Sequence, residues 1–325
     1  MSEIKITGHK RLVIVSGRAH PQLAIDIARH LETDVVHTDA RTFANGEIYA
    51  RYDESVRGAD VFVIQSHTFP INEWLMEQLI MVDALKRASV KRITVVAPFY
   101  PYGRQDKKGR GREPISARLV ADLYKAAGAD RIMSVDLHAA QIQGFFDGPV
   151  DHLFAMPVLL EHFQAILDPA TLTVVSPDMG RVRVADIWSD KLGAPLAIIH
   201  KRRDPLIPNK VTVHEIVGEV DGRVCLLVDD MIDTGGTIVK AAEALKAAGA
   251  TRVVVAATHA IFSNPASELL QHAAIDSVVV TDTLPIPEEK RFSTLTILPI
   301  APLIARAIYE VFDDGSVTSM FDGAA

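Results

Sequence analysis

Nine short runs of consecutive apolar residues, rich in valine and isoleucine, recur along the chain. Their apolar character is continuous rather than alternating, which is typical of strands buried on both faces, as in a parallel sheet. We expect strands at "RLVIVSG" (11–17), "DVFVIQS" (60–66), "RITVVAPFY" (92–100), "RIMSVDLH" (131–138), "LTVVSPD" (172–178), "PLAIIHKR" (195–202), "RVCLLVDD" (223–230), "RVVVAATH" (252–259) and "SVVVTDT" (277–283).

Longer segments with apolar residues three and four positions apart lie between these runs and predict helices. The segments "PISARLVADLYKAAG" (114–128) and "GTIVKAAEALKAAG" (236–249) also end in glycine, which commonly caps the carboxyl end of a helix. Strands that alternate with helices predict the α/β class, with helices on both faces of a mostly parallel sheet.

One stretch of the chain is repeated in similar form. The segments "ADLYKAAGADRIMSVDLHA" (121–139) and "AEALKAAGATRVVVAATHA" (242–260) align without a gap. Either any helix–glycine–strand segment looks like this, or the chain consists of two similar α/β halves. In both cases Gly148, Pro149 and Pro157 favour a boundary near residues 148–158.

Composition is that of a globular protein, with 48% apolar and 23% charged residues among 325, enough for two domains and a sizeable core. The net charge of −7 argues against a general nucleic-acid or anionic-membrane partner. With one cysteine, Cys225, no intramolecular disulfide is possible. The chain start has no apolar signal segment, and no run approaches the roughly 20 apolar residues of a membrane span. We therefore expect a cytoplasmic protein.

Polar residues gather directly after the expected strands, where open parallel sheets bind their ligands. Five such clusters are rich in arginine, lysine and aspartate and together indicate a site for phosphate and metal. They are "PYGRQDKKGRGR" (101–112), "DLH" (136–138), "SPDMGRVR" (176–183), "HKRRDP" (200–205) and "DDMIDTGGT" (229–237).

The last cluster combines two kinds of binding group. Gly235 and Gly236 allow successive N–H groups to point at one anion, the helix from about Thr237 adds its positive end, and Thr234 and Thr237 offer hydroxyls. Asp229 and Asp230 are acceptors suited to the hydroxyls of a ribose, and Asp233 is expected to hold the loop by accepting N–H bonds. The alternative, a strand that ends in an aspartate-rich helix cap, explains a single Asp-Thr-Gly but not the whole pattern.

This loop resembles the ribose-phosphate signature of the type I phosphoribosyltransferase fold. The rest of the chain is similar to class I ribose-phosphate diphosphokinases of the bacterial type. The similarity rests on ordered blocks such as "FANGEIYARYDESVRGADVFVIQS", "APFYPYGRQDKK", "DLHAAQIQGFF", "VVSPD", "HKRR" and "VDDMIDTGGTI". It implies two similar domains, each a mostly parallel sheet flanked by helices, at residues 1–152 and 153–325, with the last helix returning to the first domain.

The resemblance implies that the chain transfers the diphosphoryl group of MgATP to the 1-hydroxyl of ribose 5-phosphate, releasing AMP and supplying phosphoribosyl pyrophosphate for nucleotide, histidine, tryptophan and NAD synthesis. The chain has no Walker A pattern, so discrete cations and Mg²⁺ have to meet the phosphate charge. The basic loop 104–112 supplies such cations, although by itself it could be a solvated loop or a nucleic-acid patch. By resemblance, Arg104, Gln105, Asp106, Lys107 and Lys108 contact or lie beside ATP.

Further site residues follow from the resemblance alone. Lys201 and Arg203 match the catalytic loop, where cations stabilise charge on the transferred group, and Pro205, Pro208 and Asn209 favour a loop there. His138 and Asp178 match the Mg²⁺ contacts, although Mg²⁺ prefers oxygen ligands and a lone histidine after a strand is more often structural.

Phe43, Asn45 and Glu47 match the adenine contacts, which in the family come from a neighbouring subunit. This implies a homo-oligomer based on a dimer, commonly a hexamer, whose active site is shared between subunits. Ser55, Arg57, Ser316 and Thr318 resemble the allosteric phosphate site.

One residue departs from the family pattern. After Ser-Pro-Asp the family usually has two glycines, whereas this chain has "MGR", with Arg181 in the place of the second. The contacts on the diphosphate side are therefore open.

Three other functions fit the sequence less well. A phosphoribosyltransferase does not explain "FANGE", "RQDKK" and "DLH", and a non-catalytic paralogue would lack Lys201, Arg203, His138 or Asp178. A nucleic-acid module disagrees with the negative net charge.

Overall fold

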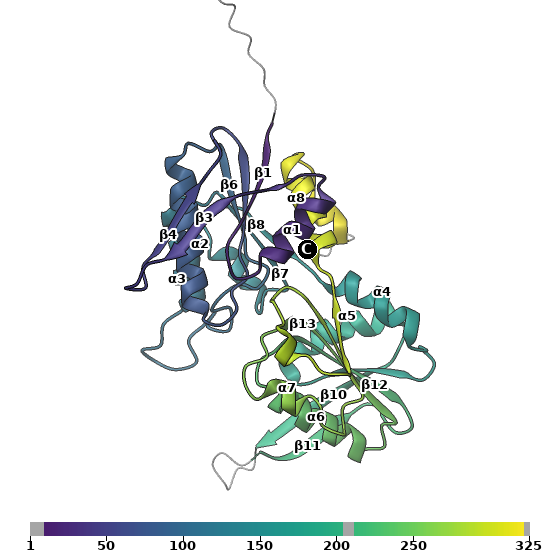
Figure 1. Ribbon diagram of the computed structural model, residues 1–325. Helices are drawn as coiled ribbons and strands as arrows, with labels where there is room; N and C mark the ends of the chain where they lie inside the picture. Colours follow the sequence, from purple (N-terminus) through teal and green to yellow (C-terminus); the bar gives the residue numbers. More distant parts are fainter. Residues whose placement is uncertain (1–9, 204–210, 322–325) are drawn as a thin grey trace, which may run out of the picture. The chain divides into compact units, whose positions relative to one another are not determined.

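Two sheets organise the chain, and each belongs to its own unit (Figure 1). The computed structural model describes the backbone of residues 10–203 and 211–321, and the side chains of that range apart from residues 201–214. Contacts between residues divide the chain into unit 1, Met1–Leu153 with Ala301–Ala325, and unit 2, Phe154–Ile300.

The sheet of unit 1 has six strands, and every neighbouring pair is parallel. Its central strands are almost fully buried, which fits their continuous apolar sequence. In spatial order the strands are β2 (Val35–Val36), β1 (Leu12–Ser16), β5 (Asp60–Ile64), β6 (Arg92–Val96), β7 (Arg131–Val135) and β8 (Val150–Leu153).

Helices and a hairpin complete unit 1. The last long helix of the chain, α8, contacts the first one, α1, and Figure 1 shows the two alongside each other. The hairpin is a separate two-stranded antiparallel sheet. The elements are α1 (Pro21–His30), α2 (Ile71–Arg87), α3 (Ser116–Ala127), α8 (Ala301–Phe312), β3 (Thr38–Thr42) and β4 (Ile48–Tyr52), with 3-10 turns at Ala140–Gly144 and Val317–Phe321.

The sheet of unit 2 has seven strands, of which only the edge strand β11 is antiparallel to its neighbour. In spatial order they are β11 (Val211–Val217), β10 (Leu196–Arg203), β9 (Leu172–Ser176), β12 (Val224–Ile232), β13 (Arg252–Ala260), β14 (Ser277–Thr281) and β15 (Leu295–Leu298). The helices are α4 (Met156–Ile166), α5 (Val182–Leu192), α6 (Gly236–Ala247) and α7 (Ala266–Leu269), with 3-10 turns at Met179–Arg181 and Glu288–Lys290. The predicted α/β class with two mostly parallel sheets is confirmed.

The two sheets share one topology. If β11 is set aside, both have the spatial order second, first, third, fourth, fifth and sixth, where the strands of each sheet are counted along the chain. The repeated sequence does not follow this correspondence, because residues 121–139 contain β7, a fifth strand, whereas residues 242–260 contain β13, a fourth strand. The similarity between the halves therefore lies in their topology, and the repeat reflects the general form of a helix–glycine–strand segment.

All nine strands expected from apolar runs are present, and the sheet strands that were not expected are the edges. β2 and β8 border the first sheet, and β11 and β15 border the second. β15 is only partly buried along its length, so an edge strand needs no continuous apolar run. Among the described residues, no helix is both long and apolar enough to cross a membrane.

Candidate active site

The carboxyl end of β12 carries the two adjacent carboxylates of Asp229 and Asp230, called the acidic pair below. β12 lies beside β9, and the order of strands reverses between them, since β10 lies on the other side of β9. Such a reversal opens a crevice at the carboxyl ends of the strands, the usual ligand site of an open α/β sheet. The side chains of Asp229 and Asp230 are 19% and 9% exposed.

Burial raises the pKa of Asp229 to about 8, and the neighbouring charge of Asp230 acts in the same direction. Arg181 opposes this rise through its positive charge. The backbone N–H of Asp230 also donates to Asp229 Oδ1 at 2.9 Å. The acidic pair is thus a site where negative charge is costly and where cationic or hydroxyl donors are favoured.

The loop that follows β12 leads directly into the amino end of α6. Gly235 has φ of +79°, the left-handed conformation that glycine adopts most easily, and α6 has no side-chain cap. Thr234 and Thr237 are exposed, and Asp233 and Gly236 are half-buried. Because the first N–H groups of a helix have no partner within it, this uncapped end is suited to an anion.

The loop after β9 reaches the acidic pair from the neighbouring strand. Asp178 Oδ1 accepts the N–H of Gly180 at 2.8 Å, and Ser176 Oγ donates to the carbonyl of Asp178 at 2.7 Å. Arg181 then points its guanidinium at the acidic pair, with Nε 3.3 Å from Asp229 Oδ1 and Nη2 2.6 Å from Asp230 Oδ1. The φ of Arg181 is −105°, so a glycine is not required there.

Two side-chain contacts hold the basic loop of unit 1, one at the buried Asp106 and one at the exposed Gln105. Asp106 is buried, and its carboxylate accepts the side-chain amide of Gln141. Gln105 Oε1 accepts the hydroxyl of Ser116 at 2.6 Å, whereas the other three members of the predicted ATP loop are exposed: Arg104, Lys107 and Lys108. Asp106 and Gln105 thus shape the loop and leave its cations at the surface.

His138 lies beside this loop. A Cβ built on Gly103 would lie 3.6 Å from Cβ of His138, so the loop and the segment after β7 are in contact. Asp178, the other predicted metal contact, belongs to unit 2. Among the described residues, no group of three or more histidine, cysteine, aspartate or glutamate side chains could hold a metal ion.

The predicted adenine contacts Phe43, Asn45 and Glu47 lie together at the tip of the β3–β4 hairpin. The N–H of Phe43 donates to the carbonyl of Glu47 at 2.7 Å, and Asn45 Oδ1 accepts the N–H of Glu47 at 3.2 Å. Phe43 is 46% exposed. Cζ of Arg41 lies over the ring of Tyr49, 4.7 Å from its centroid, and is 5.9 Å from the ring centroid of Phe43. The tip is a preformed, exposed surface with one aromatic face.

The remaining predicted residues differ in how far the structure describes them. Lys201 and Arg203 lie in the last part of β10, but their side chains are outside the described residues, as are Pro205, Pro208 and Asn209. Ser55, Arg57, Ser316 and Thr318 are all exposed residues of unit 1, and the carbonyl of Ser55 accepts Arg11 Nη1 at 2.6 Å.

Known proteins resemble this chain from end to end. Residues 12–128 match the family model described as the N-terminal domain of ribose phosphate pyrophosphokinase, and residues 199–322 match the phosphoribosyl synthetase-associated domain. The chain is 65% identical over 322 residues to a ribose-phosphate pyrophosphokinase of Streptomyces avermitilis, covering 99% of each chain. It is 58% identical over 326 residues to that of Mycobacterium tuberculosis, covering 100% of each.

The chain belongs to the ribose-phosphate pyrophosphokinase family.

A solved structure of the family also matches. The crystal structure of phosphoribosylpyrophosphate synthetase from Mycobacterium smegmatis has a TM-score of 0.88 and 57% identity, and the match covers 94% of this chain and 100% of that one. The fold expected from the resemblance is therefore confirmed for this member of the family.

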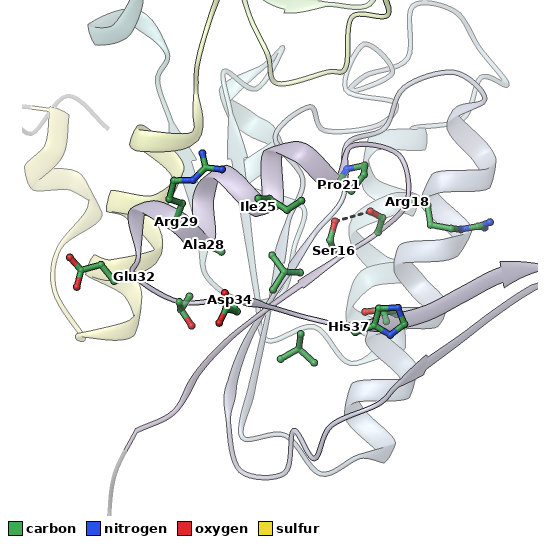
Figure 2. A pocket seen from close by; sticks show the side chains of 14 residues that line it. Ser16, Arg18, Pro21, Ile25, Ala28, Arg29, Glu32, Asp34 and His37 are labelled. Carbon is green, nitrogen blue, oxygen red and sulfur yellow. Dashed lines mark hydrogen bonds between the residues drawn. The ribbon is translucent and has the colours of Figure 1, made fainter.

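A recess in unit 1 lies apart from all the residues predicted for the pyrophosphokinase site. Its volume is about 810 Å³, and it runs between α1 and residues 33–38. Figure 2 shows Ile25 and Arg29 of α1 on one wall and His37 on the other. None of the fourteen lining residues is a predicted site residue, so the recess is not used in the function proposed below.

Sequence reasoning missed two contacts in this family member. Arg181 was singled out as a departure from the pattern, but its pairing with the acidic pair was not foreseen. Arg41 and Tyr49, which support Phe43, carried no recognisable motif. The nearest signal for this contact is alternation along the two strands of the hairpin, with Arg41 and Phe43 in "RTF" and Tyr49 at the end of "EIY".

Proposed function

We propose that this chain transfers the diphosphoryl group of ATP to the 1-hydroxyl of ribose 5-phosphate, forming phosphoribosyl pyrophosphate and AMP. The observation that carries the proposal is the acidic pair followed by the uncapped amino end of α6, at the crevice of the second sheet. The similarity to a ribose-phosphate pyrophosphokinase over 99% of the chain supports it.

Ribose 5-phosphate is proposed to bind in unit 2. Its phosphate would accept N–H groups at the start of α6 and the hydroxyls of Thr234 and Thr237. Its ring hydroxyls would donate to the carboxyl oxygens of Asp229 and Asp230. Asp233 and the two glycines of the loop would hold the phosphate pocket in shape.

ATP is proposed to use cations and a stacking surface. The exposed Arg104, Lys107 and Lys108 would meet its phosphates, supported by Gln105 and Asp106. Lys201 and Arg203 would stabilise charge on the transferred group. The tip formed by Phe43, Asn45 and Glu47 would hold adenine, with Phe43 against its face.

Mg²⁺ is the proposed metal, with Asp178 and His138 as its protein contacts. One carboxylate fits an ion that is usually held by one or two carboxylates together with substrate phosphates, and the imidazole is the less typical donor. When bound with ATP, Mg²⁺ would neutralise phosphate charge. The protein side chains position the acceptor hydroxyl and the phosphate chain.

Two broader features are part of the proposal. The adenine-binding tip would serve a neighbouring copy, so the active form would be a homo-oligomer of at least two chains, with a hexamer as the expected size. Exposed Ser55, Arg57, Ser316 and Thr318 would form a phosphate effector site. The lone Cys225 is buried, and burial raises its pKa to about 11, so it is an inert thiol that suits a reducing, cytoplasmic setting.

The proposal is tested by measuring AMP release from MgATP with and without ribose 5-phosphate. We expect AMP only with the sugar phosphate, matched by an equal amount of phosphoribosyl pyrophosphate. ADP in place of AMP would contradict diphosphoryl transfer, and no turnover by folded, oligomeric protein would favour a non-catalytic paralogue.

A variant of the acidic pair tests the binding model. Asp230→Asn removes a charged acceptor, and because a charge-assisted hydrogen bond contributes about 1.5–3 kcal/mol, the KM for ribose 5-phosphate should rise roughly tenfold or more. Asp186→Asn, which changes an exposed carboxylate of α5, is the matched control and should leave the KM unchanged. An unchanged KM in Asp230→Asn would contradict the role of the acidic pair.

A further inference from the structure

Arg181 contacts both of the carboxyl groups that the proposed function assigns to the sugar. Its Nη2 is 2.6 Å from Asp230 Oδ1 and its Nε is 3.3 Å from Asp229 Oδ1, so one guanidinium spans both carboxylates. Each carboxylate oxygen has a limited number of acceptor directions. A ribose whose hydroxyls donate to the acidic pair therefore competes with Arg181 for the same acceptors.

Unit 1 contains a related contact that serves as an internal comparison. The loop after its first strand also sends an arginine, Arg18, to a carboxylate, that of Glu77 on α2, with Nε 2.5 Å from Oε2. Glu77 has no exposed side-chain surface, and it also accepts the N–H of Arg18 at 2.7 Å and the amide of Gln65 at 2.9 Å. The carboxylate of Glu77 is thus enclosed and accepts three donors, while the side chain of Arg18 keeps 32% of its surface exposed.

The carboxylates of the contact in unit 2 are more accessible than that of Glu77. The side chains of Asp229 and Asp230 are 19% and 9% exposed, and that of Arg181 is 16% exposed. Arg181 belongs to a short 3-10 turn at the start of α5, whereas the acidic pair belongs to a sheet strand. The guanidinium can therefore leave the carboxylates by side-chain rotation, without any movement of the sheet.

We propose that Arg181 is a counter-ion that ribose 5-phosphate displaces from the acidic pair, and that it thereby sets the affinity of the free protein for this sugar phosphate. This inference rests on the proposed function, because it takes the acidic pair as the acceptor of the ribose hydroxyls. Before the sugar binds, Arg181 places a positive charge against both partly buried carboxyl groups of the acidic pair. When the sugar binds, its hydroxyls take over part of that role.

The sign of a substitution follows from this competition. Without the guanidinium, the hydroxyls of the sugar no longer compete with Arg181 for the two carboxylates. Removal of Arg181 should therefore strengthen the binding of ribose 5-phosphate. An arginine that directly held the sugar phosphate, or only supported the loop, would give the opposite sign when removed.

The test is isothermal titration of ribose 5-phosphate into the full-length protein without nucleotide. Arg181→Met keeps an unbranched side chain and removes the guanidinium with its charge, Arg181→Lys keeps a charge with one donor group, and Arg183→Met removes an exposed charge from the same helix. We expect Arg181→Met to bind about tenfold more tightly than the wild type, equivalent to about 1.4 kcal/mol. Arg181→Lys should fall between them, and Arg183→Met should equal the wild type.

Equal or weaker binding by Arg181→Met would overturn the inference, and an equal gain in Arg183→Met would assign the effect to net charge and overturn it as well. In an Asp230→Asn background, Arg181→Met should tighten binding by clearly less than tenfold, because the competition needs the charged partner. If the wild type itself failed to bind ribose 5-phosphate, the proposed function would be wrong. If the wild type bound the sugar phosphate and Arg181→Met did not bind it more tightly, only the inference about Arg181 would be wrong.

Discussion

At the scale of single residues, the acidic pair shows how position rather than residue type sets chemistry. Asp229 is one of many aspartates, but its burial beside a second carboxylate raises its pKa to about 8. A buried carboxylate with a raised pKa costs stability once it is ionised. The site is therefore a local weak point of unit 2 as well as its proposed sugar-binding surface.

Asp229→Asn should change how the stability of the protein depends on pH. The raised pKa means that the stability contributed by Asp229 is present below its ordinary pKa near 4 and is lost as pH rises toward about 8. The variant has no such loss, so the difference in melting temperature between it and the wild type should move in its favour from pH 5 to pH 8. Asp186→Asn should show no such trend, and a difference independent of pH would contradict the assignment.

The part of the candidate site that is formed by consecutive residues could be predicted from the sequence. The acidic pair and the glycines of the loop are readable from residues 226–238, because strand, turn and helix follow each other directly. The contact of Arg181 with Asp230 joins two segments that the sheet brings together. Which oxygen a long side chain reaches depends on the register of β9 and β12, and a sequence without its fold does not contain that information.

At the scale of elements, the fold was predictable in its interior and not at its margins. The apolar runs located every central strand, because a strand covered on both faces must be apolar throughout. The edges β2, β8, β11 and β15 and the β3–β4 hairpin have mixed sequences, and their pairing depends on neighbours that are remote in the chain. The repeat in the sequence left two interpretations open, because the local form of a helix–glycine–strand segment does not determine the position of its strand in a sheet.

The hairpin tip provides a prediction about the nucleotide. Phe43→Ala removes the exposed aromatic face, and because stacking of a base on an aromatic side chain contributes about 1–3 kcal/mol, the KM for ATP should rise roughly tenfold. The KM for ribose 5-phosphate should stay within about twofold. Tyr309→Ala, which removes another exposed aromatic side chain, is the control. A KM for ATP equal to that of the wild type would exclude Phe43 from adenine binding.

A buried histidine network joins three elements of unit 1. His67, just after β5, is within hydrogen-bond distance of the carbonyl of Phe99 at 3.2 Å and of the hydroxyl of Tyr124 on α3 at 3.2 Å. That hydroxyl donates to Gln78 of α2 at 2.7 Å. Phe99 lies in the segment that leads from β6 to the basic loop, so the network supports this segment. Burial lowers the pKa of His67 to about 4.

His67→Gln should make the protein less sensitive to acid. A depressed pKa means that the stability His67 contributes is present above about pH 6.5 and is lost as pH falls toward 4. Melting temperatures measured from pH 7 to pH 4 should fall less steeply in the variant, which starts lower because it loses the hydrogen-bond geometry. His30→Gln, at an exposed position of α1, should retain the wild-type slope. An identical slope in His67→Gln would refute the role of this residue.

At the scale of the whole molecule, unit 1 is assembled from both ends of the chain. The segment Met1–Leu153 and the segment Ala301–Ala325 belong to one unit, with unit 2 inserted between them. Ile304 and Ile308 of α8 are fully buried, and α8 contacts α1. The stability of the first unit therefore depends on the last residues of the sequence.

Ile308→Ala should destabilise unit 1 selectively. Deletion of a buried isoleucine side chain costs about 2–5 kcal/mol. Hydrogen exchange followed by peptide mapping should show faster exchange in α1, in α8 and in the six-stranded sheet of unit 1, with the exchange of unit 2 unchanged. Arg306→Ala, at a largely exposed position of the same helix, should have little effect. If hydrogen exchange became faster by the same factor in both units, the expectation that α8 stabilises unit 1 selectively would be wrong.

The late arrival of α8 has a consequence for synthesis on the ribosome. Residues 154–325 take roughly 10 to 35 seconds to synthesise at about 5–20 residues per second. During that interval α1 has been made but its helical partner has not, whereas unit 2 is continuous in sequence and is completed before the final helix. We therefore expect the nascent first unit to expose apolar surface until α8 is made, and to bind chaperones during that time. A chain released from a ribosome that stalls near residue 300 would contain only one complete unit, unit 2.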